Sequence, residues 1–287
     1  MRDYTVIIPT LNAAEGIDAL LDALAAQTLP PREIVVVDSA SEDGTLDRAR
    51  AHAGVRAMEI SRRAFDHGGT RDMAVRGCET PAVVLMTQDA LPMDPGCMAA
   101  LLRPLEDPAV AAVCGRQVAR RDARAREKAV RAFRYPAESA VWGSDDIPRL
   151  GVRAYLLSDV CAAYRRSAYL AVGGFERPIE TNEDMLIASD FLKAGYRLAY
   201  AADARVWHSH DFTLREEYAR NRRIGAFMAR YADRLEGLSA TDEGLRMVKR
   251  VSAELLRQGR VIEWIGFGCN CLARALGNRA GRRRAHG

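Results

Sequence analysis

Acidic and histidine side chains follow three predicted strands, at the points where the strands end. Asp38 follows one apolar run, Asp89 follows Val83–Met86, and His208 ends a third run. A carboxylate at the end of a buried strand needs hydrogen-bond donors or a cation, and carboxylate oxygens suit Mg²⁺ and Mn²⁺. A neutral imidazole can complete such a metal shell. Asp89 and His208 are therefore candidate metal ligands, with His210 on the same face if the chain stays extended.

Each of these residues also has an ordinary structural explanation. Asp38 can cap the turn that follows it, and Asp89 can begin a turn toward Pro92. His208 can be a hydrogen-bonded histidine of the core or the surface. The spacing alone leaves both explanations open.

A pair of carboxylates, Glu183 and Asp184, stands where a predicted helix begins. The helix continues to about Ala194, and Gly195 marks its end. The positive end of the helix dipole favours ionised carboxylates at this place, which would keep a base deprotonated near neutral pH. The alternative role is helix capping, because the two preceding residues are also good N-terminal residues.

Two glycine-containing segments are candidate binding loops. In Phe65–Arg71, two glycines allow close approach to the backbone, and Arg71 can pair with phosphate oxygens. This segment is expected to line a diphosphate. Gly173–Phe175 is either a loop beside bound ligands or an ordinary turn.

The predicted strands must bring these residues together. Five short apolar runs indicate strands: 4–8, 33–37, 82–86, 109–114 and 198–206. Amphipathic helices are predicted after the first and second runs, and this alternation predicts a parallel sheet covered by helices. Ligands bind such sheets outside the carboxyl ends of the strands. The loops that begin at Pro9, Asp38 and Thr87 should therefore face one crevice.

The composition is that of a folded globular chain. Of 287 residues, 48% are hydrophobic and 28% charged, which excludes disordered, collagen-like and coiled-coil classes. The sequence predicts no membrane span and no signal peptide, so a cytosolic protein is expected. The six cysteines lack zinc spacing and are expected to be reduced. Residues 246–287 hold ten Arg or Lys against two Glu, a local charge of +8. Because the net charge of the chain is +4, the remainder is about −4, and the basicity lies in the tail.

The order of these features resembles glycosyltransferase family 2, the inverting nucleotide-sugar enzymes of the GT-A fold, over residues 3 to 212. The resemblance rests on VIIPTLNAAEGIDALLDALAAQT, on VVVDSASEDGT, and on GGF followed by ED and a histidine. The segments FDHGGTRDMA, LMTQDALP and CGRQ look most like bacterial rhamnosyltransferases that use dTDP-rhamnose. Two departures stand out. Many members have Asp-x-Asp where this chain has Thr87-Gln88-Asp89, and Asp72 replaces the asparagine of HGGTRN.

The resemblance implies a role for each candidate residue. Asp184 would be the catalytic base, with Glu183 positioning it or the acceptor. Asp89 and His208 would bind Mg²⁺ or Mn²⁺. The residues implied to bind the nucleotide or substrate are Pro9, Thr10, Asn12, Glu15, Asp38, Ser39, His67, Gly68, Arg71, Gln88, Gly173 and Gly174.

The basic tail has two competing explanations. Its apolar stripe suits a helix lying on an anionic membrane, with Trp264 and Phe267 as interfacial anchors. Alternatively, a helix packs on the catalytic domain with its charges in solvent. Gly266 and Gly268 argue against one long helix. Nucleic-acid binding is not expected, because no aromatic-interleaved basic patch accompanies the arginines.

The sequence thus predicts an α/β protein with a mostly parallel GT-A sheet flanked by helices. A catalytic domain would span 1–212, and a basic helical region 213–287. The predicted activity is metal-assisted transfer of rhamnose from dTDP-rhamnose to a glycan or a polyprenyl-diphosphate-linked acceptor, in the cytosol or at the inner face of the cell membrane. The alternatives are a UDP- or GDP-sugar donor, or a sugar-nucleotide or membrane-surface binding protein without turnover.

Overall fold

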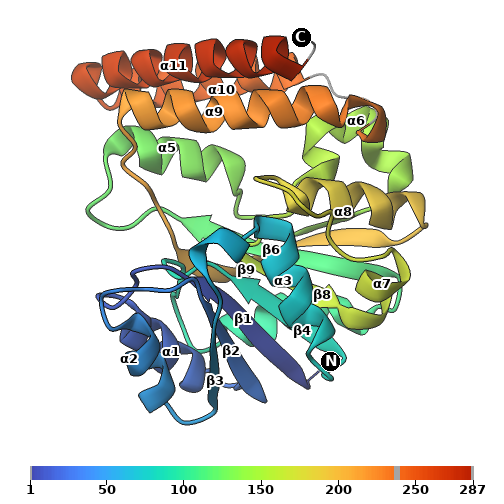
Figure 1. The fold of residues 1–287 in the computed structure, drawn as a ribbon. Helices are drawn as coiled ribbons and strands as arrows, with labels where there is room; N and C mark the ends of the chain where they lie inside the picture. Colours follow the sequence, from blue (N-terminus) through green and yellow to red (C-terminus); the bar gives the residue numbers. More distant parts are fainter. Residues whose placement is uncertain (1, 236–239, 286–287) are drawn as a thin grey trace.

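One sheet organises the structure, a computed structural model that describes residues 2–235 and 240–285 (Figure 1). Its strand order is β3-β2-β1-β4-β8-β6-β9-β5, and β7 pairs with β9. The strands are β1 (Tyr4–Thr10), β2 (Glu33–Asp38), β3 (Val55–Glu59), β4 (Ala82–Met86), β5 (Leu91–Pro92), β6 (Val110–Val118), β7 (Ala140–Trp142), β8 (Cys161–Arg165) and β9 (Arg197–Trp207).

The first half of the sheet is parallel, as the sequence predicts. Strands β2 and β4 both pair with β1, and Thr10 lies opposite Asp38 at the end of the β1–β2 ladder. All five residues of β4 are buried, as expected for a strand covered on both faces. The carboxyl ends of β1, β2 and β4 therefore meet at one edge of the sheet.

Three strands, β5, β7 and β8, run antiparallel to the others within a sheet that is mostly parallel, as expected. Strand β8 runs between β4 and β6 against both of them, so its first residues lie at the edge where β4 and β6 end. Strand β5 pairs antiparallel with the end of β9, with Leu91 opposite Trp207. Residues just before β5 and β8 thereby join the carboxyl-end edge.

Helices cover both faces of the sheet. Alternate residues of β1 face opposite sides, so Val6 and Ile8 pack in one core and Ile7 in the other. The first core includes α1 and α4, and the second includes α3, α7 and α8. The helices before residue 200 are α1 (Ile17–Ala25), α2 (Thr45–Ala51), α3 (His67–Arg76), α4 (Cys97–Leu102), α5 (Ala125–Arg134), α6 (Ile147–Leu150), α7 (Arg166–Ala171) and α8 (Glu183–Lys193).

Three C-terminal helices form a separate layer above α5 (Figure 1). They are α9 (Leu214–Arg230), α10 (Ala240–Arg257) and α11 (Val261–Ala285). Phe227 and Met228 of α9 join one core of the sheet, while Val251, Leu255 and Phe267 pack with Val130 of α5. The layer thus packs on the rest of the chain. The division at residue 212 stays a prediction.

Helix α11 is longer than the sequence predicts, because it continues through Gly266 and Gly268. Two further glycines explain how it packs. A Cβ at Gly277 would lie 2.4 Å from the carbonyl oxygen of Tyr218, and one at Gly281 would lie 1.9 Å from that of Arg222. These glycines let the backbones of α9 and α11 touch, and this close packing outweighs the low helix propensity of glycine.

We predict that Gly281→Ala destabilises the protein by about 2 kcal/mol or more, because the added methyl group overpacks the α9–α11 contact. Gly268→Ala in the same helix is the matched control. No atom lies within 4 Å of its added Cβ, so its stability should stay equal or rise by about 0.5–1 kcal/mol. Chemical denaturation followed by circular dichroism measures both. Equal stability of the two variants would contradict the close packing.

Candidate active site

Asp89, His208 and His210 meet at the carboxyl-end edge of the sheet. Asp89 lies two residues before β5, and the histidines follow β9, so the β5–β9 pairing brings them together. Oδ2 of Asp89 lies 3.4 Å from Nε2 of His208 and 3.7 Å from Nδ1 of His210. One ligand atom from each residue lies within 4.8 Å of the others, a spacing that could hold a metal ion. The predicted pair is thus joined by His210.

Gln117 orients His208 from the opposite side of its ring. Oε1 of Gln117 lies 2.9 Å from Nδ1 of His208 and accepts a hydrogen bond from its N–H group, so Nε2 faces Asp89. In the neutral ring, a lone pair then points at a carboxylate oxygen, an arrangement that a shared cation stabilises. Burial is the main cause that lowers the pKa of His210 to about 4. His210 is therefore neutral at pH 7 and free to bind a metal. These residues fit a divalent ion.

A second cluster surrounds the buried guanidinium of Arg71. Nη1 of Arg71 lies 3.1 Å from Oε1 of Glu183, and Nε lies 3.6 Å from Oδ2 of Asp159. Asp184 adds a third carboxylate whose charge acts on Arg71. His67 is exposed at the edge of this cluster, with Nδ1 4.0 Å from Glu183. Four of the predicted site residues are thus close together, and Asp159, which was not predicted, lies among them.

Two of the carboxyl groups around Arg71, those of Asp159 and Asp184, have raised pKa values. Burial raises the pKa of Asp159 to about 7, although Arg71 opposes the shift. The pKa of Asp184 is raised well above its ordinary value, by burial first and then by Asp159 and Glu183. The expectation that the helix dipole keeps Asp184 ionised is therefore wrong in direction, because burial and neighbouring negative charge outweigh the dipole.

Asp38 organises the loops at the ends of β1 and β2. It is fully buried, and its Oδ1 accepts hydrogen bonds from Oγ1 of Thr10 at 2.8 Å and Oγ of Ser41 at 2.6 Å. The backbone N–H of Ser41 donates to Oδ2 at 2.8 Å. The capping role is therefore present. The buried hydroxyl of the adjacent Ser39 has no partner in the described chain.

The neighbouring candidates hold the same loops in place. The side chain of Gln88 bonds both backbone groups of Leu11, at 2.7 and 3.0 Å. Asn12, at a positive φ of 50°, accepts the N–H of Glu42 with its side chain. Pro9 lies in β1 opposite Val37, and Glu15 is exposed on the loop. These residues shape the crevice that the parallel strands open.

The glycines of the two candidate loops serve packing. The segment after Phe65 is helix α3 rather than a loop, because Asp66 caps it by accepting the N–H of Gly69. A Cβ at Gly68 would lie 2.2 Å from the carbonyl oxygen of Glu176. Gly173 and Gly174 both have positive φ, at 94° and 83°, in the turn after α7. Close packing thus explains Gly68, and the backbone conformation of the turn explains Gly173 and Gly174, without a ligand.

Asp72 belongs to this packing too. Its fully buried carboxylate accepts hydrogen bonds from Arg76 at 2.8 Å, Arg177 at 2.5 Å and the hydroxyl of Tyr169 at 3.0 Å. A Cβ at Gly174 would lie 2.3 Å from Oδ1 of Asp72. The acid that departs from the family pattern therefore ties α3 to the turn after α7.

Sequence reasoning missed Asp159 and Gln117 as functional neighbours. Asp159 lies two residues before the antiparallel strand β8 and within an apolar patch of the sequence, residues 156–163. An acid inside that patch is the signal that could have identified it, because a carboxylate among apolar residues needs a partner. Gln117 lies in the quoted segment CGRQ, but nothing in its spacing points to His208.

Comparisons with known proteins agree with this geometry. The family model described as glycosyl transferase family 2 matches residues 5–173. The chain is 38% identical over 256 residues to the O-antigen chain rhamnosyltransferase RfbN of Salmonella typhimurium, covering 88% of this chain and 81% of the relative. It is 37% identical over 261 residues to the O-antigen chain rhamnosyltransferase WbaN of Salmonella anatum, covering 90% and 82%.

Solved structures show the same fold. The mannosyltransferase PcManGT from Pyrobaculum calidifontis, in complex with GDP-Man and Mn²⁺, superposes with a TM-score of 0.66 at 22% identity, covering 96% of this chain and 86% of that one. TarS residues 1–349 from S. aureus, in complex with UDP-GlcNAc, give 0.58 at 16% identity, covering 98% and 92%. The GT-A fold is confirmed, and the chain is a glycosyltransferase that belongs to glycosyltransferase family 2.

Proposed function

We propose that this glycosyltransferase transfers rhamnose from dTDP-rhamnose to a glycan or lipid-linked acceptor during synthesis of a cell-surface polysaccharide. The two Salmonella relatives, both called O-antigen chain rhamnosyltransferases, support the sugar and the pathway class. The observation that carries the chemistry is the meeting of Asp89 with His208 and His210 at the carboxyl-end edge. The buried acid cluster around Arg71 lies at the same edge.

Asp89, His208 and His210 would hold Mn²⁺ or Mg²⁺. Oxygen and neutral imidazole ligands suit Mn²⁺ in particular. When bound, the ion neutralises the charge that builds on the leaving nucleoside diphosphate. Gln117 keeps Nε2 of His208 facing Asp89, and this fixed orientation is what the chain itself contributes to the ligand set.

Asp184 would be the base that accepts the proton of the acceptor hydroxyl. As that oxygen bonds to the anomeric carbon, the bond from this carbon to the diphosphate breaks, and the proton stays on Asp184. The side chain is half-buried at the start of α8, and its backbone-bonded Oδ1 has a fixed position. A raised pKa makes a carboxylate a stronger base near neutral pH. Glu183, held by Arg71, would position the acceptor or the base.

The loops at Thr10–Glu15 and Asp38–Ser39 would enclose the nucleotide. Both carboxylate oxygens of Asp38 accept hydrogen bonds from Thr10 and Ser41. Its contribution to nucleotide binding would therefore be mainly the shape of the pocket. His67, Arg71 and Gln88 would line the donor side. Gly68, Gly173 and Gly174 would act through packing and turn geometry.

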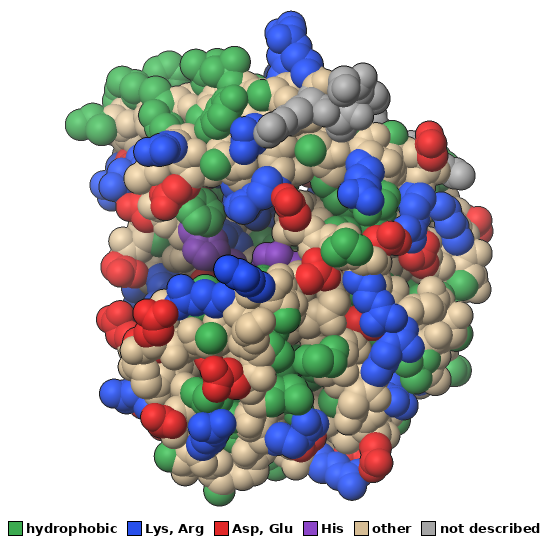
Figure 2. All heavy atoms as spheres, in the orientation of Figure 1, with side chains coloured by type: hydrophobic (Ala, Val, Ile, Leu, Met, Phe, Trp, Pro, Cys, Tyr) green, Lys and Arg blue, Asp and Glu red, His purple; other side chains and the backbone are tan. Residues whose placement is uncertain are grey.

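The outer face of α11 would lie on the anionic membrane surface. Its exposed apolar residues are Val261, Ile262, Ile265, Leu272 and Leu276, with Ile262 85% exposed. Figure 2 shows hydrophobic side chains gathered at the top left, over the end of the helical layer where α11 begins in Figure 1. Phe267, expected to be an interfacial anchor, is buried against α5, whereas Trp264 is exposed. None of the described helices is long and apolar enough to cross a bilayer.

Donor choice tests the proposed function first. With Mn²⁺, nucleoside diphosphate release from dTDP-rhamnose should exceed that from dTDP-glucose, UDP-sugars and GDP-sugars by about tenfold or more in kcat/KM. Chelator should abolish it, because the Asp89 cluster then lacks its cation. A coupled assay of diphosphate release and calorimetric binding of each donor measure both effects.

The controls separate the alternatives. Asp89→Asn should lose metal-dependent release, and Asp47→Asn, an exposed acid of α2, should keep it. A preference for a UDP- or GDP-sugar would contradict the rhamnose assignment. Binding of nucleotide without release from any donor would contradict catalysis and support the binding protein without turnover.

The acid limb of the pH profile tests the base. Asp184 must be ionised to accept a proton, so kcat/KM should fall as pH drops through its raised pKa. The charge of Asp159 helps to raise that pKa. Asp159→Asn should therefore lower the pKa of Asp184 and move the acid limb to lower pH. Release of diphosphate measured from pH 4 to 9 gives the limb.

Two further variants frame this result. Asp184→Asn should lower the rate by about 10²- to 10⁴-fold while donor binding persists. Asp145→Asn, an exposed acid outside the cluster, should leave the limb in place. An acid limb that does not move in Asp159→Asn would contradict the coupling between the two carboxyl groups.

Membrane contact has its own test. The double substitution Ile262→Glu and Leu272→Glu puts charge on the apolar face of α11 and should greatly reduce flotation with phosphatidylglycerol-containing vesicles. Val141→Glu, at an exposed apolar position on β7, is the control and should float like the parent chain. Equal flotation of both variants would show that α11 is not the contact.

A further inference from the structure

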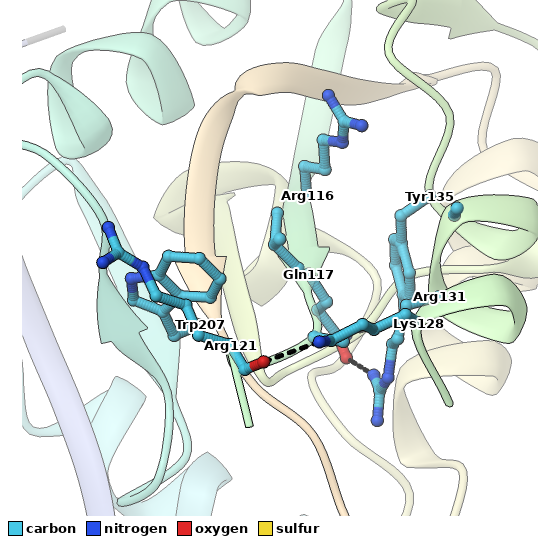
Figure 3. Close-up of a pocket in the computed structure, with 10 residues that line it drawn as sticks. Arg116, Gln117, Arg121, Lys128, Arg131, Tyr135 and Trp207 are labelled. Carbon is cyan, nitrogen blue, oxygen red and sulfur yellow. Dashed lines mark hydrogen bonds between the residues drawn. The ribbon is translucent and has the colours of Figure 1, made fainter. Parts of the chain in front are cut away.

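A cavity of about 400 Å³ lies beside the site, between the end of β6, helix α5 and Trp207. Figure 3 shows Arg121 and Trp207 on one side and Arg116 and Gln117 of β6 between them and the other side. On that other side lie Lys128 and Arg131 of α5 and Tyr135, which directly follows this helix. Four of the ten described residues that line it are cationic, and none of those ten is acidic. We call it the basic cavity, lined by Arg116, Gln117, Arg121, Lys128, Arg131, Tyr135 and Trp207.

Most of this positive charge is not neutralised by the protein. Arg131 bonds Glu127 at 2.7 Å and also Gln117. Lys128 donates to the carbonyl oxygen of Arg121, at 2.6 Å, and the guanidinium of Arg121 lies 6.0 Å from the ring centre of Trp207. Neither these two residues nor Arg116 forms an ion pair with a described carboxylate.

Further arginines add to the charge behind α5. Burial lowers the pKa of Arg134 and of Arg220, and Arg274 and Arg131 lower each of them further. Arg274 is already paired with Glu217, at 2.5 Å. Cations gathered at this density create a positive potential that an anionic ligand would relieve.

Two residues connect the basic cavity with the group of Asp89, His208 and His210. Gln117 lines the cavity and also accepts a hydrogen bond from Nδ1 of His208. Trp207 lines it and directly precedes His208. An anion in the cavity would therefore lie next to the proposed donor diphosphate, although different side chains would bind it.

We propose that the basic cavity binds the diphosphate group of a lipid-linked acceptor. A neutral glycan gives no reason for this many unpaired cations, whereas a diphosphate pairs with several Arg and Lys side chains. The donor diphosphate would have its own cation, held by Asp89, His208 and His210. The indole of Trp207 and the phenol of Tyr135 offer flat surfaces for a sugar ring. This inference rests on the proposed function, because it assumes that the acceptor is carried on a lipid.

Binding of farnesyl diphosphate in chelator tests the cavity apart from the metal. The parent chain should bind it, and the double variant Arg116→Gln, Lys128→Gln should bind it at least tenfold more weakly. The charge-keeping variant Arg116→Lys, Lys128→Arg should restore binding. Arg32→Gln, whose arginine pairs with Asp3 at the opposite edge of the sheet, is the control. Arg131 is left intact because it bonds Gln117. Calorimetry measures the affinities.

Two comparisons decide what the cavity recognises. Inorganic pyrophosphate should show the same sensitivity to the double variant but bind more weakly than farnesyl diphosphate. Equal affinity for the two would overturn a lipid-linked ligand. Binding of dTDP with Mn²⁺ should change less than twofold in the double variant, and an equal loss there would overturn the separation from the donor site.

The outcome is independent of turnover. If the double variant binds farnesyl diphosphate as the parent does, the basic cavity is not an acceptor site, even where transfer is observed. If no donor is ever turned over, the proposed function fails, whatever binds in the cavity.

Discussion

One buried guanidinium, that of Arg71, faces three carboxylates, and the chemistry of the site depends on this imbalance. Burial raises the pKa values of Asp159 and Asp184, and Arg71 offsets this rise only in part because its closest contact is with Glu183. A base that holds its proton more strongly accepts one more readily from a hydroxyl group. Removing Arg71 would leave buried negative charge unpaired, so this cation stabilises the edge and limits the rise in the pKa values of Asp159 and Asp184.

The strand order of the sheet assembles both the carboxylates around Arg71 and the group of Asp89, His208 and His210. Parallel strands β1, β2 and β4 bring loops to one edge, and the antiparallel strands β5 and β8 add Asp89 and Asp159 to it. The helical layer of α9, α10 and α11 then stands over α5, whose Lys128 and Arg131 line the basic cavity.

The sequence predicted what local pattern and family motif order carry. The strands at 4–8, 33–37 and 82–86 and the helix start at Glu183 are confirmed, because apolar runs and capping residues act locally. It missed α3, because its glycines oppose a helix and only the contact of Gly68 with Glu176 explains them. Asp159 also escaped, since the antiparallel course of β8 depends on distant pairing. The roles of the nucleotide-binding candidates stay predictions.

The central claim is that one carboxylate, Asp184, activates the acceptor for direct displacement at the anomeric carbon. The anomeric configuration of the product tests it most directly. Nuclear magnetic resonance of the glycosylated product should show a configuration opposite to that of the sugar in the donor, since a single displacement inverts this carbon. Retention of configuration would require a second displacement and would contradict the account.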